Sequence, residues 1–510
     1  MSRSTLPQQT DVPDGRVPVL VALLLVLVAI VLFKLDVPLG RPGQFTYPYS
    51  PIATQRITAL PDALVLAALL AAGIGLVCAA RRWLRLAGFL LAVVAGVALA
   101  GWVYFAPPQF RSQQFFNMQS PSHDGAFLTE AFHARRVGLQ EYLQGFPERA
   151  RTPPDEMRGT RVISNPPATT LLAAGTIGLL EASPRLAGWL RAVGVNEQLP
   201  PREEWLVTAS AGFSLLLLLL WLLAGLPLYA AGRLFLSPPA AAAIAVVCLF
   251  SPPTLLFAPG KDPAQLLTVA LPLWLWLLAW RRHRPWAAAL AGVLFTLACL
   301  VSLVHVWIGV IVFVATALRT PAGRRRRFVL GICTPALAGA LAVVGGLALL
   351  AGTNFLACAW AAARAQAEIT RGADAMPLVW QALGLPLFLL FVGPALWSVG
   401  LWLLRRRLRD GDARFGLCLI AGAAGIMLAT IGFTNVETPR LWIPFAPLLL
   451  LGAALQLPLF RRPGERAAVL LAALVFVQIG VAAVQWSLMD MREAETRLLE
   501  RGPSGPRMFE

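Results

Sequence analysis

A short segment, residues 120–133, carries the acids Asp124 and Glu130 and overlaps a run of apolar residues with helical spacing. The run contains Phe127, Leu128, Ala131, Phe132, Leu139, Tyr142, Leu143 and Phe146. A helix of this pattern can lie flat in a membrane interface with its polar face toward water. Asp124, at the start of that helix, is a candidate general base for an acceptor at the membrane surface. Aspartate is equally suited to capping a helix by accepting backbone N–H bonds.

Two further polar residues, Glu130 and His133, stand three positions apart and therefore share one face of this helix. With help from Asp124 or His123, they could bind a divalent metal ion, since carboxylate and imidazole groups are common metal ligands. A solvated polar face would explain the same residues. The sequence thus leaves open a divalent metal as a cofactor.

The segment 161–167 ends in Pro166 and Pro167, directly before an apolar stretch. Proline suits the first turn of a helix, and Ser164 or Asn165 can supply the cap. We therefore expect a helix to start near Pro166.

Two other segments place charges at the ends of apolar runs. Lys261 and Asp262 stand side by side at a corner, where they could orient a substrate or form a plain turn with solvated charges. Glu437 and Arg440 stand one helical turn apart at the end of another run. Arginine binds phosphate oxygens bidentately, and charges at this depth are costly enough to indicate function. The alternative is an interfacial anchor, in which Arg440 snorkels toward water.

The composition requires these segments to be positioned by membrane helices. Of the 510 residues, 57% are hydrophobic and 14% are charged, whereas a soluble chain has about 45–50% apolar residues. The net charge of +17 comes from arginines in short clusters between apolar runs, without aromatic residues interleaved on a polar face. We therefore expect membrane lipids, and not nucleic acid, as partners.

Apolar runs of about 17–25 residues are long enough to span a bilayer as helices. A double-length stretch at 286–319 is broken near Ser302 and His305 and predicts a pair of spans. We predict an all-α, polytopic membrane helix bundle of about 13 transmembrane helices, with further juxtamembrane and re-entrant helices on the outer face. The other runs are 17–33, 62–80, 86–106, 205–231, 236–258, 264–280, 328–351, 384–404, 413–433, 441–459 and 467–486.

Arginine clusters predict the orientation, because positively charged loops stay in the cytoplasm. All clusters face the same side only if the segment 166–180 enters from the outer face without crossing, so we expect a re-entrant or interfacial helix there. The amino terminus is then cytoplasmic, the carboxy terminus is external, and the acidic segments share the outer side. The clusters are 81–85, 281–284, 324–327, 405–407 and 461–462.

Together these segments resemble the GT-C class of integral membrane glycosyltransferases, the superfamily of protein O-mannosyltransferases and bacterial aminoarabinose and arabinofuranosyl transferases. The resemblance covers most of residues 100–460. We divide the chain into residues 1–85, a signal anchor and additional hairpin, 86–460, a GT-C-like core with the outer loop 107–204, and 461–510, the last span with a short external tail. The resemblance is carried by the acids Asp124 and Glu130, by Asn165-Pro166-Pro167, by Arg233-Leu234-Phe235, by Asp262, and by the segment from Glu437 through Arg440 to Trp442.

The resemblance implies transfer of a sugar, with inversion, from a polyprenyl-phosphate donor to an acceptor at the outer face of a bacterial cytoplasmic membrane. It implies that Asp124 is the base, that Asp262 is an acid that orients the acceptor, and that Arg440 binds the donor phosphate. Glu130 is a further candidate catalytic acid. The remaining candidate substrate-binding residues are His123, Asn165, Lys261 and Glu437.

Two other functions remain open, namely a transporter or lipid flippase, and a non-catalytic polytopic membrane protein. A transport path needs polar residues deep within the spans. The apolar runs of this chain hold few such residues, and the acids cluster at their outer ends.

Overall fold

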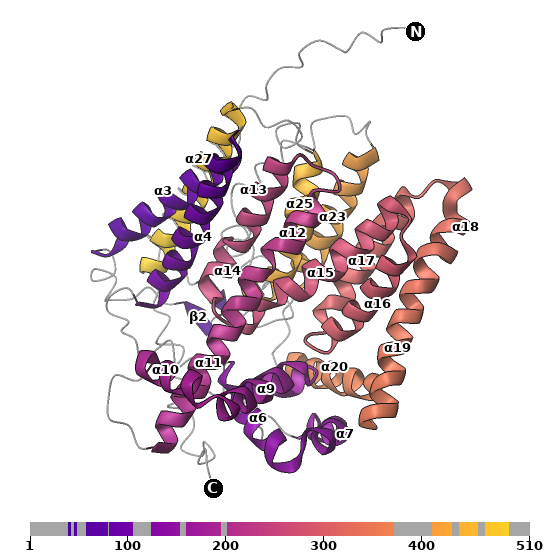
Figure 1. The fold of residues 1–510 in the computed structure, drawn as a ribbon. Coiled ribbons are helices and arrows are strands. Elements are labelled where there is room, and N and C mark those ends of the chain that lie inside the picture. The colour runs from indigo at the N-terminus through magenta and orange to yellow at the C-terminus, as the bar shows by residue number, and fades with distance from the viewer. Residues whose placement is uncertain are drawn as a thin grey trace.

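The chain folds into a bundle of helices, with a layer of shorter helices across one end (Figure 1). Apart from one antiparallel pair of strands, β1 (Leu39–Arg41) and β2 (Phe45–Tyr47), the described elements are helical, which confirms the prediction of a helical chain. The computed structural model describes residues 39–41, 45–47, 58–79, 81–105, 124–152, 160–194, 201–371, 411–430, 438–456 and 465–488.

Five helical stretches in the described part of the chain are long and apolar enough to cross a membrane. They correspond to predicted runs, so a membrane protein with several spans is supported. Their elements are α3 (Leu60–Val77), α4 (Arg82–Phe105), α11 (Pro201–Leu223) with α12 (Gly225–Gly232), α15 (Lys261–Arg282), and the joined elements η1 (Ala322–Arg324), α18 (Arg325–Phe328), η2 (Val329–Cys333) and α19 (Thr334–Ala351).

Other predicted runs form helices whose described apolar part is shorter. The double-length stretch is a pair of helices separated at residues 300–303, as predicted. These elements are α13 (Pro238–Leu249), α14 (Pro252–Phe257), α16 (Pro285–Cys299), α17 (Val304–Arg319), α23 (Gly411–Thr430), α24 (Thr438–Trp442), η3 (Ile443–Phe445), α25 (Ala446–Gln456) and α27 (Glu465–Leu488). The predicted runs and clusters that lie outside the described residues are 17–33, 384–404, 405–407 and 461–462, and the count of about 13 spans therefore stays a prediction.

Helix α15 connects two ends of the bundle that differ in chemistry. Its 22 residues rise about 33 Å from first to last. At its last turn, Trp280 Nε1 donates a hydrogen bond to Thr320 Oγ1 at 3.2 Å. The arginine clusters 281–284 and 324–327 therefore lie side by side at what we call the arginine end, with α18 at the upper right of Figure 1. The predicted orientation requires these two clusters to share an end.

Short helices cover the opposite end of the bundle, which we call the site end (Figure 1). One of them, α9, packs against α6, α10 and α11 within this layer. That location agrees with a segment 166–180 that does not cross the bundle, while its depth in a membrane stays a prediction. The helices of the layer are α6 (Gly125–Val137), α7 (Leu139–Arg149), α8 (Thr160–Ser164), α9 (Ala168–Ala182), α10 (Pro184–Gly194) and α20 (Phe355–Arg371).

The expected single flat helix after Asp124 is instead two helices, α6 and α7, divided at Gly138. The φ of Gly138 is 99°, a conformation that side chains other than glycine rarely adopt. The apolar face is not turned to lipid, since Phe127 and Phe146 are each only 1% exposed and pack in a core shared with α9 and α20. Most of the predicted apolar positions are therefore buried, although Leu139 is 43% exposed, and their partner is protein.

Candidate functional site

Asp124 stands at the N-cap position of α6, yet its carboxylate makes no capping hydrogen bond. Instead, Oδ1 accepts a hydrogen bond from Arg161 Nη1 in an ion pair. Oδ2 accepts a hydrogen bond from the backbone N–H of Lys261 at 2.6 Å. The capping interpretation of Asp124 is therefore wrong. This carboxylate, which is 4% exposed, joins the starts of α6 and α15 to α8.

The buried side chain of Lys261 contacts the segment that carries Arg161. Its Nζ donates a hydrogen bond to Asn165 Oδ1 at 2.7 Å and lies 5.3 Å from the centre of the Phe127 ring. The amide of Asn165 in turn donates from Nδ2 to the carbonyl oxygen of Arg161 at 2.7 Å. Asn165 therefore fixes the ammonium group of Lys261 relative to the segment that carries Arg161.

The start of α9 differs from the prediction. Its N-cap residue is Pro167, which has no side-chain cap, so the expected cap by Ser164 or Asn165 is not formed. The physical reason is that the side-chain oxygen of Asn165 accepts a hydrogen bond from Lys261 Nζ and does not cap α9. The proline pair still marks the start of the helix, as predicted.

Asp262 forms the second ion pair of the site. Its Oδ2 lies 2.8 Å from Arg440 Nε, which comes from α24. Its Oδ1 accepts a hydrogen bond from Gln265 Nε2 at 2.6 Å and lies 3.8 Å from Lys261 Nζ. Both carboxylates of the site, Asp124 and Asp262, are therefore buried and bound to arginine from another segment.

Direct contacts thus bring together five of the residues selected from the sequence, which are Asp124, Asn165, Lys261, Asp262 and Arg440. Two more members, Arg161 and Gln265, were not selected. We call these seven residues the polar cluster, and it contains three cations and two carboxylates. Cationic groups in such a cluster favour binding of phosphate oxygens. The remaining candidates His123 and Glu437 lie outside the described residues.

A sequence signal for Arg161 exists, although it is weak. Arg161 stands four residues before Asn165 and hence on the same side of a helical turn. An arginine at that spacing before a buried polar residue can reach the same site. Nothing in the sequence indicates that its partner is a carboxylate 37 residues away.

Glu130 belongs to a separate ion pair that is partly buried. Arg149 binds it through two hydrogen bonds, one of them from Nη2 to Oε2 at 2.8 Å. Burial, with Arg149 adding to it, lowers the pKa of His133 below its ordinary value. Its ring meets Tyr142 edge-on at 6.4 Å. Within the described ranges no group of three His, Cys, Asp or Glu residues could hold a metal ion, and Glu130 has a guanidinium partner.

Gly260 allows the Asp124 carboxylate to approach the backbone before α15. A Cβ at this position would lie 2.9 Å from Asp124 Oδ2 and 2.6 Å from the carbonyl oxygen of Phe257. We expect Gly260→Ala to lower the free energy of unfolding by about 1–3 kcal/mol, because well-packed sites resist added volume. Thermal unfolding of the purified protein in detergent, followed by circular dichroism, measures this change.

The matched control for Gly260 is Gly175 in α9, where a Cβ would have no neighbour within 4 Å. Gly175→Ala is expected to be neutral or to stabilise the protein by up to about 1 kcal/mol, since alanine favours the helix. Equal effects of the two substitutions would show that the approach of Asp124 is not tight.

Polar side chains continue from the cluster along α15 toward the bundle interior. Thr268 Oγ1 donates a hydrogen bond to the carbonyl oxygen of Gln265 at 2.9 Å and lies 2.9 Å from His305 Nε2. His305 Nδ1 is 2.8 Å from the carbonyl oxygen of Ser302. His305 is therefore a hydrogen-bonded residue at the tip of the α16–α17 pair.

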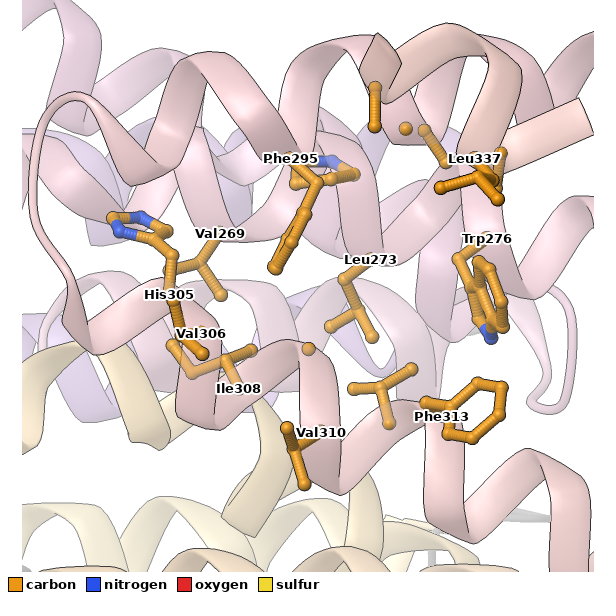
Figure 2. Close-up of a pocket in the computed structure, with 17 residues that line it drawn as sticks. Val269, Leu273, Trp276, Phe295, His305, Val306, Ile308, Val310, Phe313 and Leu337 are labelled. Atoms are coloured by element: carbon orange, nitrogen blue, oxygen red, sulfur yellow. The ribbon is translucent and has the colours of Figure 1, made fainter. Parts of the chain in front are cut away.

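Beyond His305 an apolar cavity of about 410 Å³ lies between α15, α16, α17 and α19 (Figure 2). Its lining includes Leu273, Phe295 and Phe313, and Trp276 lies at the end away from His305. Apart from His305 and the indole of Trp276, the lining residues are aliphatic, aromatic or glycine. A cavity of this kind favours a hydrocarbon group over a polar one.

Comparison with known proteins finds no matching family model, no matching curated protein and no matching solved structure. The class of protein is therefore defined by its structure alone. It is a helical protein with several helices able to cross a membrane and a buried polar cluster at one end.

Proposed function

We propose that the chain is an inverting membrane glycosyltransferase, which transfers a sugar from a polyprenyl-phosphate donor to an acceptor at the outer face of the cytoplasmic membrane. One observation carries the proposal. Asp124, Asp262 and Arg440, which come from three distant segments, converge with Lys261 in one buried polar cluster. Buried charges are costly, so in a membrane protein they are candidates for a functional site.

In the proposed reaction, the acceptor attacks the anomeric carbon as the bond from that carbon to the phosphate oxygen breaks. Asp124 takes the proton of the acceptor, and the polyprenyl phosphate leaves with both bonding electrons. Arg440 binds the phosphate as its charge increases, while Asp262 orients the acceptor. A base at one end and a cation at the other stabilise both charges that develop in the transition state.

The lipid character of the donor is supported by the neighbouring cavity. Gln265 and Thr268 connect the polar cluster to His305, which borders the apolar cavity. A donor with a phosphate and a hydrocarbon chain needs both environments close together. We assign the hydrocarbon chain to the cavity and the phosphate to the cluster.

A transporter or lipid flippase is the second candidate, because the polar residues along α15 begin a path into the bundle. That path ends at His305, and the cavity beyond it is apolar. A polar headgroup would lose its hydrogen bonds there at a cost of several kcal/mol. The geometry therefore favours chemistry at the site end over passage to the arginine end.

The direct test uses the purified full-length chain in proteoliposomes with a panel of polyprenyl-phosphate hexoses and pentoses. We expect release of polyprenyl phosphate that depends on an added acceptor extract and rises linearly with protein. Folded protein that releases nothing from any donor would overturn the proposal. Movement of a fluorescent lipid between leaflets by the same preparation, without release, would favour the flippase.

A further inference from the structure

The arginine end carries six exposed arginines on two turns. None of the six side chains has a hydrogen bond or an ion pair to the part of the chain that the structure describes. Asp412 pairs with the neighbouring Arg281 at 3.5 Å. We call the six residues the arginine surface: Arg282, Arg284, Arg324, Arg325, Arg326 and Arg327.

Packing below the turns holds the arginine surface together. Phe328 and Ile332, which follow the second turn, pack in one apolar cluster with Ala287 and Ala288, which follow the first. The hydrogen bond between Trp280 and Thr320 joins the preceding residues. The two turns therefore form one patch of positive charge instead of two flexible loops.

The apolar residues beside the turns indicate the depth of this patch in a membrane. Val329 and Leu330 directly follow the arginines and are 51% and 57% exposed, and Trp286 next to the other turn is 57% exposed. Exposed aliphatic side chains on a spanning helix face acyl chains, and tryptophan prefers the boundary with water. The arginine surface consequently lies at the level of the lipid headgroups.

We propose that the arginine surface binds the headgroups of anionic phospholipids. A guanidinium group binds phosphate oxygens bidentately. Six such groups at headgroup depth, without a described acidic partner, give a cationic patch that an anionic headgroup complements and a zwitterionic headgroup does not. The site is distinct from the polar cluster, because α15 separates the two by about 33 Å. It does not rest on the glycosyltransferase function.

The test compares phosphatidylglycerol with phosphatidylcholine on the purified full-length chain in a non-ionic detergent. Native mass spectrometry counts the bound lipids, and thermal unfolding reports stabilisation. We expect phosphatidylglycerol to bind at least about tenfold more tightly, since each arginine near an anionic surface contributes a severalfold preference. The variant Arg324→Gln, Arg325→Gln, Arg326→Gln and Arg327→Gln should lose this preference.

The matched control neutralises four exposed arginines elsewhere, with Arg136→Gln, Arg151→Gln, Arg185→Gln and Arg364→Gln. It changes the net charge equally and should keep the preference. The variant Arg324→Lys, Arg325→Lys, Arg326→Lys and Arg327→Lys keeps the charge and should keep most of the preference for phosphatidylglycerol. It therefore separates loss of charge from loss of folding. Equal binding of the two lipids by the wild type, or an equal loss in the control, would overturn the proposal.

Discussion

Asp124→Asn is expected to lower sugar transfer from a polyprenyl-phosphate donor by about 10²–10⁴-fold, the contribution of a general base. Asparagine keeps the shape of the side chain, and its oxygen can still accept the hydrogen bond from the backbone of Lys261. It cannot take the proton of an acceptor. The rate of polyprenyl-phosphate release at saturating donor measures the effect.

The control for Asp124 is Glu148→Gln in α7, which removes a carboxylate that is 77% exposed and pairs with Arg151 on the surface. This variant should transfer sugar at the wild-type rate. Circular dichroism and elution volume verify that both variants are folded. Transfer by Asp124→Asn at the wild-type rate would rule out the role of base.

Asp262→Leu is expected to lower the free energy of unfolding by about 3–5 kcal/mol, the usual cost of removing one partner from a buried ion pair. The loss leaves the cationic groups of Arg440 and Lys261 beside an apolar side chain. In the double variant Asp262→Leu with Arg440→Met, both members of the pair are apolar. We therefore expect the double variant to be more stable than the sum of the two single changes predicts.

A double-mutant cycle measures this coupling, from thermal or denaturant unfolding in detergent. For Asp262 and Arg440 we expect a coupling free energy above about 1.5 kcal/mol. The comparison pair is Arg364 and Glu368 on α20, whose side chains are mostly exposed. Exposed pairs contribute at most about 1 kcal/mol. Additive changes for Asp262 and Arg440 would show that they do not interact energetically.

The sequence predicts the helices well because their physical cause is local. A run of apolar residues of sufficient length forms a helix in lipid wherever it stands, since no other backbone conformation satisfies its hydrogen bonds there. The break before His305 could likewise be predicted from the polar residues that interrupt one long run. The break at Gly138 could not, because the apolar spacing continues across it and only the backbone conformation reveals it.

The members of the polar cluster were largely predictable, but their pairing was not. Asp124, Lys261, Asp262 and Arg440 stand out because charges close to membrane depth are costly. Whether Asp124 caps its own helix or binds Arg161 depends on packing between segments that are far apart in the sequence. The sequence leaves the cap open, and the tertiary contacts exclude it.

Lys261 and Asp262 are consecutive residues at the first turn of one rigid helix. The backbone amide of Lys261 binds the Asp124 carboxylate, and the side chain of Asp262 binds Arg440. A ligand that binds Arg440 in place of Asp262 would therefore change the contacts of the helical turn that also binds Asp124. We therefore expect that a ligand bound at one half of the polar cluster would alter the free energy of binding at the other half, and such a linkage would be equal in both directions.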